Sequence, residues 1–540
     1  MAFIYVHYKK IDNNNNIMGG IASIKKSIYV KDKMFHSKQV TVERLGKVIY
    51  LSDDKKSGIF DSPIRGLVNY NVTTDTFSKV DEDDPRIINR DVFPITKVHT
   101  VFGDSYLLLE FLDKHKLLNV FREVFIDNND YERFLAHIIH DIMRDGSHIT
   151  CDNYFLKSFI SYVFPDLGIS SLKCDSRFFQ FMGDDDIKLS FFKTYIKLMR
   201  REKPTFGKAT YVDSTPLPND IVNNPFNALC SHGVTQMSIQ MRLVLILDQD
   251  SGLPVWFEII PGNVLDISTL RDISGDVLST LDIQISDYVL DAGYVSQSII
   301  KAFKIGSDKT MTARMPAKKG YPYKELYQNT KELLHKGKYQ FKRKDYTYFG
   351  IQRQIDIFGE HIYEYVYLDH YNATKGFNAY LGKHQDEFEN LKDKDKDFRM
   401  VQDGFFILVS NVDKKPKEIL EDYYCRTDIE KVFKTSKEYL KLLPIGKWNS
   451  DAVKGKILTD MISTIVYLKM RRDLVGKDMS IPDIIGSTQS LMCFRDNSDM
   501  VTVECPNKKV KECYKNLGVE IPSRIDIKSY MKDKLLIEKT

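Results

Sequence analysis

The spacing of apolar residues divides the chain into segments with different predicted structures. Residues 1–95 lack helical periodicity and look strand-like and irregular, with an Asn-rich tip at 13–16 and an extended basic run from Ser27 to Tyr50. Apolar residues then recur every three to four positions, which predicts helices at Tyr106–Phe125, Tyr131–Met143, Tyr154–Phe164 and Leu189–Glu202. We therefore expect an N-terminal region over 1–95 and a helical domain over 96–205.

From Ala209 onward, short apolar runs separated by Gly and Pro replace the helical spacing. They predict strands at Ala209–Ser214, Ile239–Leu247, Leu253–Ile260 and Tyr288–Leu290, with a helix at Asp266–Leu281 before the last one. This order is expected of an α/β fold with a ribonuclease H-like sheet, although order alone leaves other α/β folds open. A further strand at Asp308–Met315 completes the predicted first part of this core, 206–315.

Alternating aromatic residues dominate the next segment, 316–404, and predict a mainly antiparallel β insertion. The alternation is seen in Tyr339/Phe341, Tyr346/Tyr348 and Tyr363/Tyr365/Tyr367. A charged run from Lys392 closes the insertion, and a strand at Phe405–Ser410 opens the second part of the core, 405–480. This part also holds a buried helix predicted at Ala452–Arg472, and 481–540 is expected to be a mixed C-terminal tail.

One predicted helix, over 423–437, carries polar residues that share a face. At about 100° per residue, four side chains lie within an arc about 60° wide: Tyr423, Arg426, Glu430 and Lys437. An apolar stripe borders this arc at Glu430 and is formed by Ile429, Val432, Phe433, Tyr439 and Leu440. A carboxylate, two cations and an aromatic hydroxyl can together bind a phosphodiester, although Arg426 and Glu430 alone could form an ordinary surface ion pair.

Length and composition narrow the class of protein. The chain has 540 residues, of which 43% are hydrophobic and 28% charged, as in a globular protein of several domains. The longest apolar run, Ile457–Leu468, is too short to span a membrane and contains Asp460. The N-terminus also lacks a signal-peptide pattern. We therefore expect a cytoplasmic protein with no membrane partner.

The distribution of charge is more informative than the net charge of +4, which is too small to indicate a nucleic-acid partner. Residues 1–50 hold nine Lys and Arg against three acids. This local excess suits either a phosphate-binding arm or an ordinary solvated basic segment.

The cysteines and histidines give little reason to expect a zinc site. Seven cysteines are scattered along the chain without a Cys-x-x-Cys pair, which favours free thiols in a reducing compartment. His137, His140 and His148 have no thiolate partners nearby in sequence and are more simply explained as ordinary helix residues.

Two aspartates lie where predicted strands end: Asp213 in the first strand and Asp291 directly after Leu290. A buried carboxylate is costly unless it is paired or metal-bound, although an aspartate before Ala-Gly also commonly starts a loop. Together with Glu430, from a helix packed on the sheet, they could hold two divalent cations, Mg²⁺ or Mn²⁺, about 3.5–4 Å apart. Such a site supports in-line phosphoryl displacement.

These residues resemble the DDE transposases of bacterial insertion sequences. The cut-and-paste group carries the signature Tyr, two residues, Arg, three residues, Glu, six residues, Lys, and Tyr423, Arg426, Glu430 and Lys437 match it in full. The two acidic motifs of the group correspond to Val212-Asp213-Ser214-Thr215 and Asp291-Ala292-Gly293-Tyr294. Two further stretches also look familial: Pro261-Gly262-Asn263 with Asp266, and Asp403-Gly404-Phe405-Phe406.

The resemblance implies a metal-dependent transposase that hydrolyses DNA at element ends and joins the freed 3′-hydroxyl to target DNA. It assigns Asp213, Asp291 and Glu430 as metal ligands. It also assigns contacts to DNA phosphates to Tyr423, Arg426 and Lys437. Bringing two ends together implies a homodimer or larger complex. The regions 1–95 and 96–205 are then the candidates for DNA-end recognition.

The chain differs from the family pattern in one respect, and two alternative functions stay open. Relatives that form a DNA hairpin use an aromatic residue of the insertion, often Trp, whereas Trp256 and Trp448 both lie outside it. An insertion tyrosine could stack a base, or could simply pack a sheet, so hairpin and hydrolytic excision are both compatible with the sequence. The alternative functions are a metal-dependent DNA nuclease of ribonuclease H-like fold and a catalytically silent, domesticated DNA-binding protein.

Overall fold

The computed structural model divides into two compact units, Met1–Val98 and His99–Thr540. It describes these residues: 2–11, 17–29, 37–62, 64–81, 84–88, 99–144, 148–169, 172, 175–219, 221, 224–229, 238–263, 280–281, 283–317, 321–425, 427–495 and 500–534.

The first unit is a six-stranded antiparallel sheet in the simple order β1 to β6. Its strands are β1 (Ala2–Ile11), β2 (Ile17–Tyr29), β3 (Ser37–Leu51), β4 (Ser57–Ser62), β5 (Gly66–Asn71) and β6 (Thr76–Lys79), followed by the short helix α1 (Pro85–Ile88). Alternate residues such as Ile4, Ala22 and Leu45 bury one face and form a separate core. The strand-like character predicted for this region is confirmed, but the strands form a regular sheet rather than an irregular region. The Asn-rich tip at 13–16 lies outside the described residues.

The second unit begins with helices, and two of the predicted helices are each divided. The segment Tyr106–Phe125 forms α2 (Gly103–Lys114) and α3 (Leu117–Val124), because Lys116 between them has a left-handed backbone with φ of 58°. Tyr154–Phe164 likewise divides into α5 (Cys151–Lys157) and α6 (Ile160–Val163), since Ser158 between them is extended.

The other helices of this region follow the predicted periodicity more closely. Tyr131–Met143 lies within α4 (Asn128–Met143) and Leu189–Glu202 within α9 (Asp185–Glu202). The amphipathic helix α8 (Asp175–Met182), which precedes α9, was missed.

The C-terminal segment packs onto these helices. It contains α19 (Ile481–Thr488), β18 (Met492–Arg495), β19 (Met500–Val503), α20 (Lys508–Leu517), β20 (Arg524–Asp526) and α21 (Ile527–Lys534). Its strands form a small sheet with β7 (Thr100–Val101) in the order β20-β19-β18-β7. The Tyr514 hydroxyl also donates to the Gly103 carbonyl at 2.7 Å. The predicted tail thus completes the helical part of the unit.

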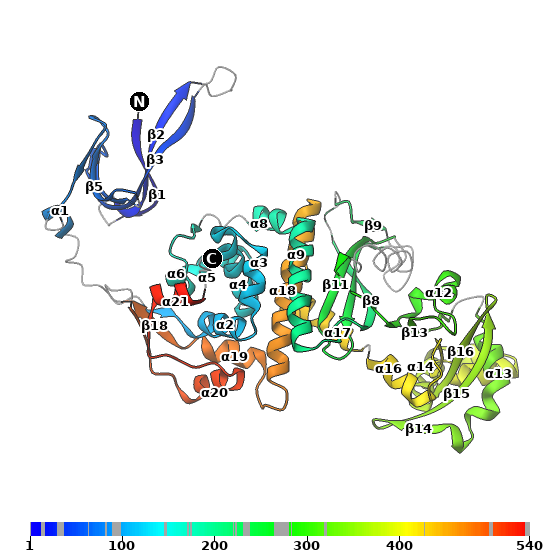
Figure 1. Cartoon of the computed structure of the whole chain (residues 1–540). Coiled ribbons are helices and arrows are strands. Elements are labelled where there is room, and N and C mark those ends of the chain that lie inside the picture. The colour runs from blue at the N-terminus through cyan, green and yellow to red at the C-terminus, as the bar shows by residue number, and fades with distance from the viewer. Residues whose placement is uncertain are drawn as a thin grey trace. The chain divides into compact units, whose positions relative to one another are not determined.

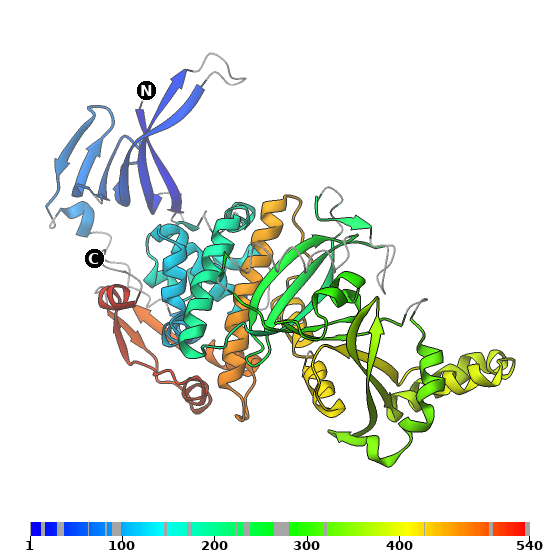
Figure 2. The same ribbon diagram turned by 45° about the vertical axis from the view of Figure 1, so that its right-hand side comes forward.

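A ten-stranded mixed sheet forms the other half of this unit (Figures 1 and 2). Its first strands are β8 (Ala209–Pro218), β9 (Ala228–Leu229), β10 (Ile239–Asp248), β11 (Pro254–Pro261), β12 (Asp287–Leu290) and β13 (Thr310–Arg314). They run in the order β11-β10-β8-β12-β13, with β12 parallel to both β8 and β13. The predicted strands are confirmed. Most of the helix predicted at Asp266–Leu281 falls outside the described residues.

The segment 316–404 is not mainly β, which corrects the expectation from its aromatic residues. The described elements are α13 (Tyr323–Leu334), η4 (Gly337–Tyr339), β14 (Gln340–Arg343), β15 (Tyr346–Ile357), β16 (Glu360–Asp369), α14 (His370–Glu389) and α15 (Asp393–Val401). Strand β16 pairs with β17 (Phe405–Ser410), which pairs with β13. The insertion strands therefore extend the same sheet, and helices α13 to α15 accompany them.

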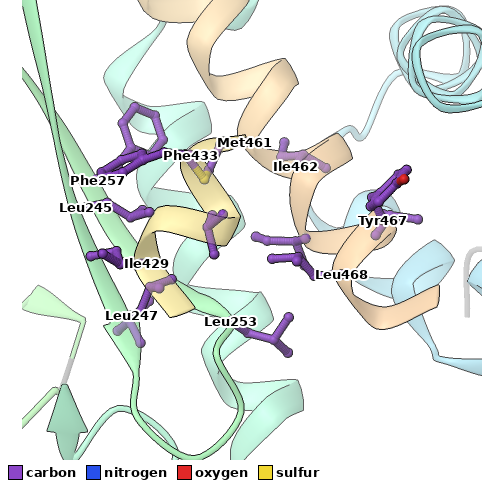
Figure 3. Close-up of a cluster of buried hydrophobic side chains, with 14 of the residues drawn as sticks. Leu245, Leu247, Leu253, Phe257, Ile429, Phe433, Met461, Ile462, Tyr467 and Leu468 are labelled. Atoms are coloured by element: carbon purple, nitrogen blue, oxygen red, sulfur yellow. The ribbon is translucent and has the colours of Figure 1, made fainter. Parts of the chain in front are cut away.

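The long helix α18 (Ser450–Asp473) joins the helical and sheet halves of the unit. It is buried along most of its length and contacts α4, α8 and β11. Helix α17 (Thr427–Lys434) lies between α18 and the sheet. Ile429 and Phe433 of α17 sit between Leu245 of the sheet and Met461 of α18 (Figure 3). Among the described residues, no helix combines the length and hydropathy needed to cross a membrane.

Replacement of Ile429 by Ala tests this layered packing. The Ile429 side chain is fully buried, so its truncation should lower the free energy of unfolding by about 2–5 kcal/mol through lost burial and cavity formation. Urea denaturation followed by circular dichroism measures the change. Lys431→Ala, at an exposed position of the same helix, should stay within about 0.5 kcal/mol of the wild type. An equally small effect of Ile429→Ala would contradict the packing.

Candidate active site

Asp213 and Asp291 are placed on neighbouring strands by the register of the sheet. Strand β12 runs parallel to β8, with Leu290 paired to Val212. The next residue on each strand is an aspartate, and Asp291 continues the extended backbone with φ of −77° and ψ of 168°. Both aspartates are half-buried, whereas Val212 and Leu290 are fully buried. Asp213 and Asp291 therefore directly follow paired residues of neighbouring strands, where the buried part of the parallel pair ends.

The face of the sheet that carries Asp213 is the face covered by α17. Asp213 pairs across the strands with Leu245 of β10, and paired residues point to the same side of a sheet. Leu245 lies beside Ile429 and Phe433 of α17 in Figure 3. Helix α17 also contacts β8 directly. The predicted third acid, Glu430, is on this helix and is exposed to solvent.

The three acids do not form a closed cluster in this structure. In the described part of the chain, no three His, Cys, Asp or Glu side chains lie close enough together to hold a metal ion. The structure thus places Asp213 and Asp291 directly after paired residues of neighbouring strands, and Glu430 on the covering helix. Their carboxylate oxygens are nevertheless the hard donors that suit Mg²⁺ or Mn²⁺.

Tyr423 faces the second aspartate. It lies on α16 (Pro416–Cys425), is 4% exposed, and its hydroxyl donates to Asp291 Oδ1 at 3.5 Å. The sequence predicted that this hydroxyl contacts DNA phosphate. In the structure it belongs to the immediate surroundings of Asp291, and the role of a DNA contact stays a prediction.

The stretch 423–437 is not the single regular helix that the sequence predicted. Helix α16 ends at Cys425, α17 begins at Thr427, and a π-helical segment, η5 (Thr435–Tyr439), follows. The Leu440 amide donates to the Thr435 carbonyl at 3.1 Å, which closes the wider turn. Tyr439 is 47% exposed, so its predicted place in the apolar stripe is wrong. Arg426 lies outside the described residues.

Lys437 is directed onto the strand that carries Asp213. Its ammonium donates to Thr215 Oγ1 at 2.6 Å and to the Pro216 carbonyl at 2.8 Å. Burial, reinforced by the nearby positive charge of Arg242, lowers the pKa of Lys437 to about 8. In this structure, Lys437 therefore fastens η5 to β8, and its predicted contact with DNA phosphate is untested.

Arg242 is a charged residue near the site that the sequence analysis missed. It lies on β10 and donates from Nη2 to Ser214 Oγ at 2.5 Å. Ser214 directly follows Asp213 on β8, so alternation turns the side chains of Ser214 and Arg242 to the other face of the sheet. The Ser214 amide in turn donates to Asp213 Oδ1 at 2.8 Å. The available signal was an arginine within an otherwise apolar strand, where a charge requires a partner.

The π-helical segment is also held from the side of α18. Ser436 donates its hydroxyl to the buried carboxyl of Asp460. Burial raises the pKa of Asp460 well above its ordinary range, and neighbouring Asp141 adds to the effect; burial also raises the pKa of Asp141 to about 7. Two adjacent residues of η5, Ser436 and Lys437, are thus bonded to elements on opposite sides.

The histidines of α4 and the indole of Trp256 are buried among, or bonded to, neighbouring side chains of the fold. His137 and His140 are fully buried in α4, and His137 stacks on Phe178 at a ring separation of 4.0 Å. The Trp256 indole donates to Glu258 at 2.7 Å and has the Lys188 ammonium 4.1 Å from its ring centre. The cysteines that the structure describes carry free thiols.

Comparison with known proteins identifies the kind of domain. A family model described as "Transposase DDE domain" matches residues 209–463, a range that includes Asp213, Asp291 and Glu430. No curated protein matches the chain. Residues 209–463 are therefore similar to a transposase DDE domain, which supports a transposase. The match does not extend to the finer bacterial group with the Tyr-Arg-Glu-Lys spacing.

Among solved structures, a piggyBac transposase synaptic complex with hairpin DNA is similar to this chain. The similarity covers 81% of this chain and 83% of that chain, with 8% sequence identity and a TM-score of 0.36. A likeness at this score carries no argument about fold or function.

The pH dependence of stability tests the position of Lys437. Its pKa is about 8 in the folded chain against an ordinary 10.5, so the unfolded chain binds more protons between these values. The free energy of unfolding should therefore rise as pH increases from about 8 toward 10.5. Lys437→Met should lack this contribution, whereas Lys434→Met, at an exposed position of α17, should follow the wild type. Parallel pH profiles for wild type and Lys437→Met would contradict the assignment.

Proposed function

We propose that this chain is a DNA transposase that cleaves DNA at the ends of a mobile element and joins the freed 3′-hydroxyl to target DNA. The observation that carries the proposal is the register of β8 and β12, which makes Asp213 and Asp291 neighbours within the segment similar to a transposase DDE domain. Glu430, on the helix that covers the same face, is the third acid of the proposed set.

We assign the core of this segment to the ribonuclease H-like class. Taking β8, β10, β11, β12 and β13 as strands one to five, the order across the sheet is 3-2-1-4-5. The second is antiparallel to both the first and the third, and the fourth runs parallel to the first and the fifth. This order supports the class expected from the sequence. On this assignment, β14 to β16 and helices α13 to α15 form an insertion before the last core strand, β17.

The proposed cofactors are two divalent cations, Mg²⁺ or Mn²⁺, held by Asp213, Asp291 and Glu430. Such cations neutralise charge on the attacking and leaving oxygens of a phosphodiester. The protein supplies the geometry: β8 and β12 fix the two aspartates, and α17 carries Glu430 on its exposed side. Since the three acids do not form a cluster in this structure, the proposal requires them to come together when metal and DNA bind.

Residues around these acids orient the site. Tyr423 holds Asp291 through its hydroxyl, and Ser214 holds Asp213 through its amide. Arg426 and Lys437 are the cations proposed to face the phosphates of the element end; the guanidinium group of Arg426 suits a forked contact and Lys437 a single-point contact. Two ends are joined in one reaction, so we further propose a homodimer in the synaptic complex. The proposed place of action is the bacterial cytoplasm, where free thiols persist.

Conservative replacement of the acids is the direct test. Asp213→Asn, Asp291→Asn and Glu430→Gln should each reduce Mg²⁺-dependent cleavage by at least about 100-fold, because an amide cannot supply the anionic ligand. End binding should be largely preserved. The substrate is a duplex carrying the inverted repeats that flank the coding sequence, and cleavage is followed on a gel alongside a binding assay.

Glu438→Gln is the matched control, since Glu438 is an exposed acid farther along the same helical stretch and should leave cleavage unchanged. Full cleavage by any of the three acid variants would overturn the assignment. Precut ends distinguish a transposase from a nuclease of the same fold: the wild-type chain should join them to target DNA. A chain that cleaves but never joins would favour the nuclease, and one that binds ends without cleaving them a silent DNA-binding protein.

A further inference from the structure

The outer face of strands β1 to β3 in the first unit carries a cluster of cations. Three rows of paired residues cross these strands: Phe3–Lys25–Thr41, Tyr5–Ser23–Arg44 and His7–Ile21–Lys47. We call these nine residues the outer face. The reverse side of the same strands carries Ile4, Val6 and Ala22, which are buried in the core of the unit. The outer face is therefore the more exposed side of the sheet, and Ser23 is its one buried residue.

Charge on the outer face has a single sign. Lys25, Arg44 and Lys47 are its charged residues, and none of its nine positions is acidic; the row of Lys47 continues to an exposed acid, Asp61, on β4. Partial burial lowers the pKa of His7, and the nearby charges of Lys25 and Arg44 lower it further. Lys25 and Arg44 thus act on the same region of the surface, around His7. On the same face, the Tyr5 side chain is 37% exposed and the Ile21 side chain is 50% exposed.

The exposed aromatic ring of this face, Tyr5, is already engaged, and the other phenyl ring, Phe3, is half-buried. The Lys25 ammonium lies 3.8 Å from the centre of the Tyr5 ring, and His7 meets that ring edge-on at 4.6 Å. Stacking of an unpaired base needs a free aromatic face, so this arrangement suits the backbone of a duplex better than a single strand. Adjacent strands lie about 4.8 Å apart, which lets cations of β2 and β3 reach several phosphates of one duplex.

We propose that the outer face of β1 to β3 binds the phosphate backbone of double-stranded DNA. This inference rests on the proposed function and gives the first unit, which lies outside the segment similar to a transposase DDE domain, a role in binding DNA. Lys25, Arg44 and Lys47 supply the contacts. They carry no sequence information, because phosphates are common to all sequences.

Salt dependence of binding tests the inference on the full chain. The probe is a 40-base-pair duplex of mixed sequence, with binding measured by fluorescence anisotropy across a salt series. In the triple variant Lys25→Gln, Arg44→Gln, Lys47→Gln, the slope of log affinity against log salt should fall by about 0.9 for each lost phosphate contact, and affinity at low salt should drop roughly tenfold or more. The charge-preserving variant Lys25→Arg, Arg44→Lys, Lys47→Arg should retain both, which excludes a folding defect.

A matched control removes the same charge elsewhere in the unit. Lys55, Lys56 and Lys79 are exposed and lie outside the outer face, so their triple replacement by Gln should leave the slope nearly unchanged. Equal losses in both triple variants, or an unchanged slope in the first, would overturn the inference. So would a selective loss of binding to a 40-residue oligothymidine with duplex binding preserved, since that would indicate base stacking.

The outcomes separate this inference from the proposed function. If the outer-face variant binds the duplex like the wild type while Asp213→Asn still abolishes cleavage, the inference fails and the proposed function stands. If the wild-type chain neither binds nor cleaves duplex DNA, the proposed function itself fails.

Discussion

The pairing of β12 with β8 is the constraint on which the arrangement of the candidate site depends. Side chains alternate between the faces of a sheet, so a slip of one residue would turn Asp291 away from Asp213. The fully buried pair Val212 and Leu290 opposes such a slip, because it would expose apolar side chains. The register that preserves the hydrophobic core is thus the register that sets Asp213 and Asp291 directly after paired residues of neighbouring strands.

Apolar packing also sets the position of the third acid, Glu430, on helix α17. Its apolar back, with Ile429 and Phe433, is packed between the sheet and α18 (Figure 3), which leaves Glu430 on the exposed side. The following π-helical segment is held on both sides, by Lys437 on β8 and by Ser436 on Asp460. Apolar packing sets where the helix lies, and these polar contacts fix its end against the strand that bears Asp213.

The sequence alone predicted the features that depend on the local pattern of apolar residues. Apolar runs located β8, β10 and β11, and the buried stripe of α17 followed from periodicity, with Tyr439 as the exception. The sequence did not predict contacts between segments that are distant along the chain. Lys437 looks like a surface cation until Thr215, far away in sequence, is placed against it. The charged run from Lys392 forms α15, where Asp397 pairs with Lys331 of α13, a residue distant in sequence. Arg242 likewise has its partner, Ser214, on the neighbouring strand β8.

Anomalous diffraction from crystals of the chain grown with Mn²⁺ and a precut end duplex tests the central claim most directly. The account predicts Mn²⁺ bonded to carboxylate oxygens of both Asp213 and Asp291, with Glu430 joined to the same site. Mn²⁺ bound without either aspartate, or bound to one aspartate while the other points to the opposite face of the sheet, would contradict it.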